Sequence, residues 1–251
     1  IRADMRGRVR TRREPWDRAV GGGGATGVGV AVDAASRGYA VLLLERSDFG
    51  KGTSSRSTKL VHGGVRYLEQ GNVTLVMEAL KERGLLRRNA PHLVRDLAFV
   101  VPNYEWWEAP FYGLGLKVYN LLAGKYGFGP SRILSREETL RRLPTIRTEG
   151  LRGGVVYFDG QFDDARLLIN LVATAVSQGA ALLNYARVIG MTRDAEGFIN
   201  GVLAREEESG EEFAAPARVV VNASGAFCDS VRRLADPGVR PLIAPSQGIH
   251  L

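Results

Sequence analysis

A glycine-rich segment near the amino terminus limits the possible folds more than any other feature. Gly22, Gly24 and Gly27 match the spacing G-x-G-x-x-G. In nucleotide-binding folds this pattern forms a tight turn, brings backbone amides close to a pyrophosphate, and lets the next helix pack closely on a strand. The pattern is weak when it stands alone, so the segments after it decide its meaning.

Those segments complete a strand–helix–strand unit. Small and apolar residues over 25–37 predict a helix that stops at Gly38, and Val41–Leu44 predict a buried parallel strand. Glu45 follows this strand, 23 residues after Gly22, where a carboxylate accepts hydrogen bonds from an adenosine ribose. The agreement favours an α/β nucleotide-binding domain over a glycine-rich turn in an unrelated α/β protein.

The amino-acid composition narrows the class of protein further. The chain has 251 residues, of which 45% are hydrophobic and 24% are charged, as in a folded globular protein. The single cysteine, Cys228, excludes an intrachain disulfide, and with only three histidines we expect no metal site. We also expect no membrane-spanning segment, because no apolar run is long enough.

Much of the net charge of +7 lies at the amino terminus. Residues 1–18 contain seven arginines and three acids, and so contribute +4. We expect residues 1–16 to form a solvated basic tail. A nucleic-acid-binding arm is a weaker alternative, because no aromatic residue precedes Trp16, and we expect no nucleic-acid partner. A targeting segment is a third interpretation, which the acids and the lack of serine oppose.

A second motif occupies residues 52–68, which are dense in hydroxyl groups and cations and include a His-Gly-Gly turn. Hydroxyls and Lys59 are suited to phosphate oxygens, and Gly63 and Gly64 allow the backbone to approach a flat ring. A polar surface loop is the alternative. We favour a ligand-binding segment, because a solvated loop has no need of this composition.

Together these segments resemble the FAD-dependent glycerol-3-phosphate dehydrogenase family. The resemblance covers about residues 16–251, and residues 53–67 carry its most specific part. Further similar segments are Ala90–Leu93, Tyr157–Arg166, Val221–Gly225 and Pro245–Leu251. The resemblance implies an α/β flavoprotein of the glutathione-reductase and D-amino-acid-oxidase type, with a Rossmann-like FAD domain and an inserted substrate domain.

By the same resemblance we expect a discontinuous FAD-binding domain from residues 17–95 and 159–251, and a substrate domain from residues 96–158. Members of the family are much longer than this chain. We therefore expect a truncated architecture that lacks downstream flavin and substrate contacts, with a strand edge left exposed.

The resemblance also implies individual roles. Arg66 binds the substrate phosphate through its planar guanidinium group, and Tyr67 lines the same pocket. His62 lies beside the flavin, either as the base that takes the C2 hydroxyl proton or only as a hydrogen-bond partner of the flavin, and His250 is a second candidate base. The residues expected to bind FAD are Gly22, Gly24, Gly27, Glu45, Thr53, Ser54, Ser57, Lys59, Val188, Ala223 and Gly225.

The implied reaction oxidises sn-glycerol 3-phosphate to dihydroxyacetone phosphate, with a hydride passing from C2 to flavin N5 and electrons passing on to membrane quinone. The implied location is cytoplasmic and peripheral on the inner face of the plasma membrane, or the mitochondrial inner membrane in a eukaryote. The alternatives are a glycerol-3-phosphate oxidase that uses oxygen, an amine or amino-acid oxidase, and an inactive FAD-binding fragment. Formation of a homo-oligomer is left open.

Two further segments admit two interpretations each. Residues 104–128 hold eight of the twenty aromatic residues, either as a membrane-facing surface or as a packing layer. We favour the packing layer, because the aromatics do not form one stripe at helical spacing. Ser135 and Glu138 predict a capping box, and Asp163 or Asp164 predicts a helix cap in preference to a catalytic acid.

Overall fold

The structure is a computed structural model, which describes the chain except for residues 1, 65–69, 247 and 249–251. The chain divides into two compact units. The first joins Ile1–Thr58 to Asp164–Leu251, and the second is Lys59–Asp163. The second unit is therefore larger than the expected insertion of residues 96–158, because its sheet also includes residues 60–61, 94–95 and 159–162.

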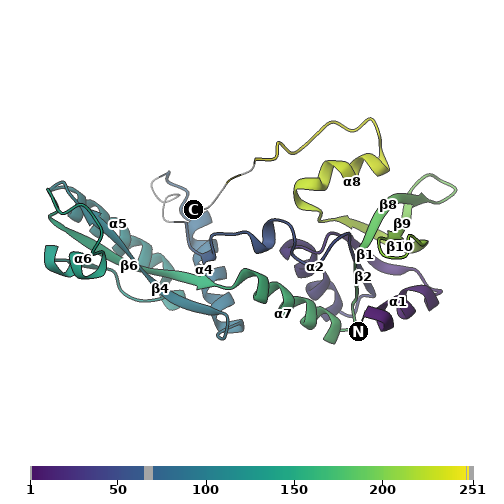
Figure 1. The fold of residues 1–251 in the computed structure, drawn as a ribbon, viewed down its shortest axis with the longest axis horizontal. Helices are drawn as coiled ribbons and strands as arrows, with labels where there is room; N and C mark the ends of the chain where they lie inside the picture. The colour runs from purple at the N-terminus through teal and green to yellow at the C-terminus, as the bar shows by residue number, and fades with distance from the viewer. Residues whose placement is uncertain (1, 65–69, 247, 249–251) are drawn as a thin grey trace. The chain divides into compact units, whose positions relative to one another are not determined.

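The first unit is built on a six-stranded sheet in the order β7-β2-β1-β10-β9-β8 (Figure 1). Strands β7, β2, β1 and the second half of β10 run parallel, whereas the first half of β10 pairs antiparallel with β9, which pairs antiparallel with β8. The strands are β1 (Trp16–Gly21), β2 (Val41–Glu45), β7 (Ala181–Asn184), β8 (Ala186–Arg193), β9 (Ile199–Glu206) and β10 (Glu212–Asn222).

Two helices pack side by side on the parallel part of this sheet, α2 (Ala25–Ser36) and α7 (Asp164–Ser177) (Figure 1). Val28 and Ala31 of α2 are fully buried there, together with Ala175 of α7. Small side chains on α2 allow this close approach, as the sequence predicted. The predicted α/β fold with a parallel sheet is confirmed. Helix α8 (Cys228–Ala235) follows β10 through the short helix η3 (Gly225–Phe227).

The basic amino-terminal segment is not a solvated tail, so that expectation is wrong. Residues Arg2–Thr11 form helix α1. Met5 and Val9, one helical turn apart, are buried in the same apolar core as Trp16 and Leu183. The abundance of arginine obscured this apolar face in the sequence, because two apolar residues are enough to dock a short helix.

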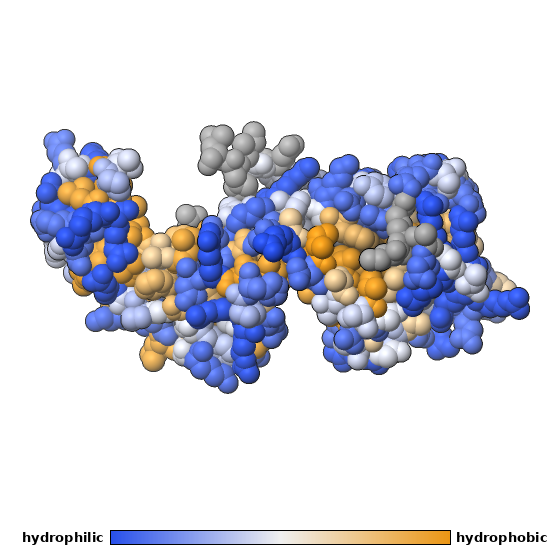
Figure 2. Space-filling view, turned by 60° about the horizontal axis from the view of Figure 1, so that its bottom comes forward, coloured by the Kyte–Doolittle hydropathy of each residue, from blue (hydrophilic) through white to orange (hydrophobic). Residues whose placement is uncertain are grey.

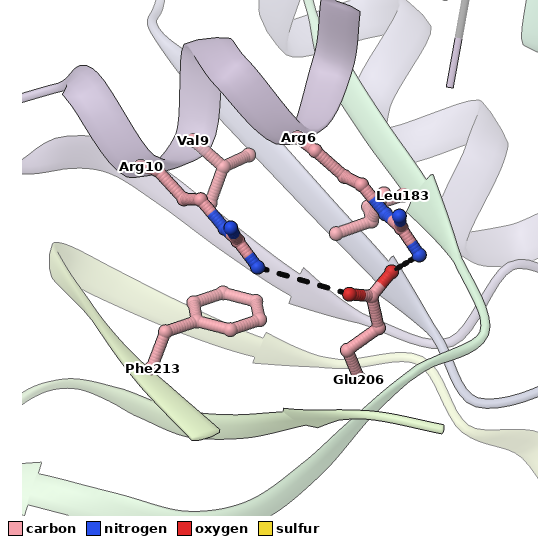
Figure 3. Close-up of a pocket in the computed structure, with 6 residues that line it drawn as sticks. All are labelled: Arg6, Val9, Arg10, Leu183, Glu206 and Phe213. Carbon is pink, nitrogen blue, oxygen red and sulfur yellow. Dashed lines mark ion pairs between the residues drawn. The ribbon is translucent and has the colours of Figure 1, made fainter. Parts of the chain in front are cut away.

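Glu206 at the end of β9 holds the arginines of α1 (Figure 3). Its carboxylate is almost fully buried and forms ion pairs with Arg6 and, at 3.8 Å, with Arg10. Arg6 also pairs with Glu208 at 3.1 Å, and Arg10 pairs with Glu211. A buried carboxylate needs such partners, because its desolvation is otherwise uncompensated.

The second unit is built on a four-stranded antiparallel sheet in the order β3-β6-β4, with β5 also pairing with β6. The predicted capping box of Ser135 and Glu138 is present at the start of α6. The strands are β3 (Leu60–Val61), β4 (Val94–Asn103), β5 (Arg132–Leu134) and β6 (Gly153–Phe162), and the helices are α4 (Val73–Asn89), α5 (Glu108–Ala123), α6 (Arg136–Arg142) and the short η2 (Gly124–Tyr126).

The aromatic-rich segment divides between core and surface. Tyr119 and Phe128 are buried, as a packing layer requires, but other apolar residues of the segment point outward. Figure 2 shows apolar side chains that reach the surface of this unit. Five of these residues recur every three or four positions and so form a stripe along α5: Trp107, Phe111, Leu114, Val118 and Leu121. The stripe mixes aromatic and aliphatic residues, which is why the aromatics alone did not reveal it.

None of the helices in the described ranges has the length and apolarity needed to cross a bilayer.

We predict that Glu206→Gln loosens α1. The substitution keeps the side-chain shape but removes the charge that pairs with Arg6 and Arg10, so the free energy of unfolding falls by about 1–2 kcal/mol. Trypsin then cuts after the arginines of α1 faster than in the unmodified protein. The control is Glu207→Gln, whose side chain pairs with Arg205 instead. Equal rates of cleavage in the two variants would contradict the role of Glu206.

Candidate functional site

The carboxyl ends of three parallel strands meet at one edge of the first unit's sheet. Gly21 ends β1 and pairs with Asn222 at the end of β10, and Glu45 ends the adjoining β2. Ala223 N donates to Gly21 O at 2.9 Å, which ties the segment after β10 to the glycine turn. This edge is where open α/β sheets bind their ligands.

The glycine turn is packed too closely to admit side chains. Gly22 has φ +117°, and a Cβ placed there would lie 2.4 Å from Ala223 O. A Cβ on Gly27 would lie only 1.9 Å from Gly22 O. A side chain at either position would therefore collide with a backbone oxygen, so both positions require glycine.

The amino terminus of α2 is open to an anion. Gly24 is its N-cap and has no side chain that could cap the helix, and the first turn contains no acid. A Cβ on Gly24 would lie 3.0 Å from Ser54 Oγ, which itself accepts a hydrogen bond from Ala25 N at 2.9 Å. Exposed amide donors and the helix dipole suit a pyrophosphate group. Ser54 lies beside this position in the short helix η1 (Thr53–Ser55), together with Thr53.

Glu45 has a structural role that the sequence did not reveal. Its Oε2 accepts from Gly23 N at 2.6 Å, and its Oε1 accepts from Ser47 N at 2.8 Å. The two donors hold the carboxylate against the glycine turn. Each carboxylate oxygen has two acceptor positions, so Glu45 retains the capacity to accept from ribose hydroxyls.

Ser57 is held by a partner far along the chain. Its backbone N and its Oγ both donate to Asp164 Oδ2, at 3.1 and 2.7 Å. Asp164 is only 4% exposed and begins α7, where its Oδ1 accepts from Ala165 N at 2.7 Å. Asp164 therefore anchors the hydroxyl-rich segment, and sequence reasoning missed this pair because its members are 107 positions apart.

The other expected FAD contacts are distributed between the units. Val188 of β8 lines a small apolar hollow together with Gly21 and Leu44, close to the sheet edge. Gly225 follows Ala223 as the first residue of η3. Lys59, with φ +61°, belongs to the second unit. Arg66 and Tyr67, the expected substrate-binding residues, lie outside the described residues. No group of metal-ligating side chains occurs in the part of the chain that the structure describes.

His62 begins a turn whose backbone is tightly held. Its side chain is exposed, and its Nδ1 accepts from Gly64 N at 3.1 Å. Gly63 N donates to the hydroxyl of the buried Tyr119 at 2.9 Å. Because a backbone amide donates only, Nδ1 has to be an acceptor, and the neutral ring carries its proton on Nε2. The His62 side chain thus presents a hydrogen-bond donor to its surroundings.

We predict opposite effects for two glycines of α2. Gly27→Ala lowers the free energy of unfolding by about 1–3 kcal/mol, because the added methyl has to displace backbone atoms. Gly29→Ala raises it by about 0.5–1 kcal/mol, because nothing lies within 4 Å of the new Cβ and alanine favours helix. Urea unfolding measures both changes. A loss of stability of equal size in the two variants would contradict the close packing at Gly27.

Comparison with known proteins shows the family of this chain. A family model described as "DAO: FAD dependent oxidoreductase" matches residues 17–251. The chain is 48% identical to a mitochondrial glycerol-3-phosphate dehydrogenase of Arabidopsis thaliana, over 96% of this chain and 40% of that protein. It is 42% identical to a mitochondrial glycerol-3-phosphate dehydrogenase of Mus musculus, over 94% of this chain and 34% of that protein.

The structure is similar to that of the glycerol-3-phosphate dehydrogenase from Bacillus halodurans complexed with FAD. The TM-score is 0.71 at 33% sequence identity, over 94% of this chain and 39% of that one. The predicted resemblance and the expected cofactor are thereby confirmed. The chain spans 34–40% of the length of these two curated relatives. Since the family model matches almost the whole chain, including the glycine turn and Glu45, the chain belongs to the DAO family of FAD-dependent oxidoreductases.

Proposed function

We propose that this chain is the FAD-binding part, with a portion of the substrate-binding part, of an enzyme that oxidises sn-glycerol 3-phosphate to dihydroxyacetone phosphate. The observation that carries most weight is the glycine turn at the open amino terminus of α2, beside Glu45. The similarity to glycerol-3-phosphate dehydrogenases supports the substrate.

In this proposal the first unit holds the ADP half of FAD. The backbone amide of Gly24 and the start of α2 bind the pyrophosphate, and Glu45 accepts from the ribose. Gly22 contributes by forming the turn, because its own amide donates to Leu44 O at 2.9 Å. Ser54 supports this proposal, because its Oγ already lies against the helix terminus. The remaining proposed contacts, to adenine, phosphate or the flavin side, are Thr53, Ser57, Lys59, Val188, Ala223 and Gly225.

FAD, when bound, supplies the acceptor for the hydride that leaves C2 of the substrate. Arg66 binds the substrate phosphate through two parallel hydrogen bonds, and Tyr67 lines the same pocket. The bond from Gly64 N to His62 Nδ1 supports one of the two roles considered for His62. With its proton on Nε2, His62 donates a hydrogen bond to an oxygen or nitrogen acceptor. Acting as a base through Nε2 would require the Gly64 bond to break.

Membrane quinone is the proposed electron acceptor, and the protein is proposed to associate peripherally with the membrane that holds it. The stripe on α5 supports this, because Trp107, Phe111 and Leu121 are exposed, with Lys117 and Lys125 close by in sequence. Aromatic and aliphatic side chains beside lysines suit a headgroup interface. The mitochondrial relatives support the mitochondrial inner membrane in a eukaryotic source, and the inner face of the plasma membrane is the bacterial equivalent.

We expect anaerobic sn-glycerol 3-phosphate to bleach the flavin absorbance of the FAD-loaded protein. Arg66→Ala raises the substrate concentration for half-maximal bleaching by about 10- to 100-fold, because a charge-assisted phosphate contact is lost. Arg141→Ala, on the exposed side of α6, is the control and leaves this concentration unchanged. Flavin that stays oxidised contradicts the proposed reaction, and a protein that never retains FAD contradicts cofactor binding by this chain.

The same reduced protein distinguishes the acceptors. Short-chain ubiquinone reoxidises the flavin faster than dissolved oxygen does if the enzyme is a dehydrogenase. Equal or faster reoxidation by oxygen supports the glycerol-3-phosphate oxidase alternative instead.

We predict that the α5 stripe binds lipid. Replacing both Leu114 and Leu121 by Gln lowers the partition coefficient on anionic phosphatidylglycerol vesicles by about tenfold or more, because two leucines no longer enter the interface. Ile169→Gln, an exposed apolar position on α7, is the control and has no effect. Vesicle sedimentation measures the partition coefficient. Unchanged sedimentation of the double variant would contradict membrane binding through α5.

A further inference from the structure

A buried ion pair lies inside the second unit, and the proposed reaction does not use it. Arg83 comes from α4, Asp159 from β6 and Tyr119 from α5, and these side chains are only 1–3% exposed. Arg83 Nη1 donates to Asp159 Oδ1 at 2.6 Å, and the Tyr119 hydroxyl donates to Asp159 Oδ2 at 2.9 Å. The desolvation free energy of two buried charges offsets much of their mutual attraction, so a contribution to folding stability alone explains this ion pair poorly.

The group leads to the turn that contains His62. The Tyr119 hydroxyl accepts a hydrogen bond from Gly63 N at 2.9 Å. The next amide, Gly64 N, donates to His62 Nδ1 at 3.1 Å. Hydrogen bonds thus run from the buried carboxylate through Tyr119 to Gly63 N. The covalent backbone of Gly63 connects this amide to Gly64 N, which donates to the His62 ring.

Each hydrogen bond in the series has a defined direction. A hydroxyl has one proton, and because Tyr119 donates it to Asp159, only its lone pairs face Gly63 N. Burial, followed by the negative charge of Asp159, raises the pKa of Tyr119 far above its ordinary value, so the hydroxyl stays protonated at physiological pH. Arg83 balances the carboxylate and lies over the ring of Phe128, 4.2 Å from its centroid.

Packing prevents the turn from shifting. A Cβ on Gly63 would come within 2.5 Å of both the Tyr119 hydroxyl and Leu80 Cδ2, so the backbone lies directly against these groups. On α4, a Cβ on Gly84 would lie 2.6 Å from Tyr126 Cβ, which shows that the helix bearing Arg83 is also closely packed. The hydroxyl of Tyr119 is therefore held at one position relative to the turn.

We propose that Arg83, Asp159 and Tyr119 are positioning residues, which hold the His62–Gly64 turn and thereby keep the proton of His62 on Nε2. They act through the backbone of the turn. The effect on catalysis rests on the proposed function, whereas the tautomer of His62 is a property of the protein without substrate. The two are separable by experiment.

The test is Tyr119→Phe, which keeps the ring and removes only the hydroxyl. We expect amide exchange at Gly63 to rise about tenfold, because its buried acceptor is gone. We also expect the imidazole ¹⁵N chemical shifts of His62, recorded by NMR at a pH at which the ring is neutral, to indicate the Nε2–H tautomer in the unmodified protein. In the Tyr119→Phe variant they indicate a mixture of the two tautomers. The chain has three histidines, which makes this signal assignable. Tyr112→Phe, on the same helix, is the matched control and leaves both signals unchanged.

The unmodified protein provides a second measurement that needs no substitution. An Nδ1–H tautomer at His62 in the unmodified protein would overturn the proposal. A folded Tyr119→Phe variant that keeps both the Nε2–H tautomer and the original amide exchange rate at Gly63 would also overturn it. In the FAD-loaded protein we expect Tyr119→Phe to lower kcat for sn-glycerol 3-phosphate with little change in KM. If the protein does not oxidise this substrate, the proposed function fails, while the NMR result still decides the role of the three residues.

Discussion

The close approach of backbone to backbone at the β1–α2 turn is the constraint on which the first unit depends. With no Cβ at Gly22 or Gly27, the turn lies directly against the segment that follows β10. Glu45 then binds the turn from β2 through Gly23 N. The same approach places a glycine at the N-cap of α2, so the helix begins without a capping side chain of its own, at the sheet edge where we propose that the pyrophosphate binds.

The second unit holds the His62–Gly64 turn in a different way. Gly63 again allows close approach, but the group that it approaches is a side chain, the hydroxyl of Tyr119, whose direction depends on Asp159. Burial of the Asp159 carboxylate carries a desolvation cost, which the ion pair with Arg83 offsets. In both units a carboxylate holds a backbone amide in place. Glu45 accepts directly from Gly23 N in the first unit, and Asp159 acts on Gly63 N through Tyr119 in the second.

Patterns confined to a few neighbouring residues predicted the local elements well. The glycine spacing, the helix beginning at Ala25 and the strand beginning at Val41 all appear as expected. The amino-terminal segment was misjudged because its arginines outnumber the two apolar residues that dock α1. The stripe on α5 was missed because its leucines and valine were not counted with its aromatics. The extent of the second unit depends on strand pairing with β6, which no single segment reveals.

The sequence by itself determined the nucleotide-binding edge of the first unit, because a turn, a helix start and a strand end each depend on residues close together in the chain. Only the tertiary structure decided which side chains hold the hydroxyl-rich segment and the His62–Gly64 turn in place. Ser57 meets Asp164 across 107 positions, and Arg83 meets Asp159 across 76. Such pairs leave no periodic signal in a sequence, because they form only after distant elements have packed and excluded water from the polar groups between them.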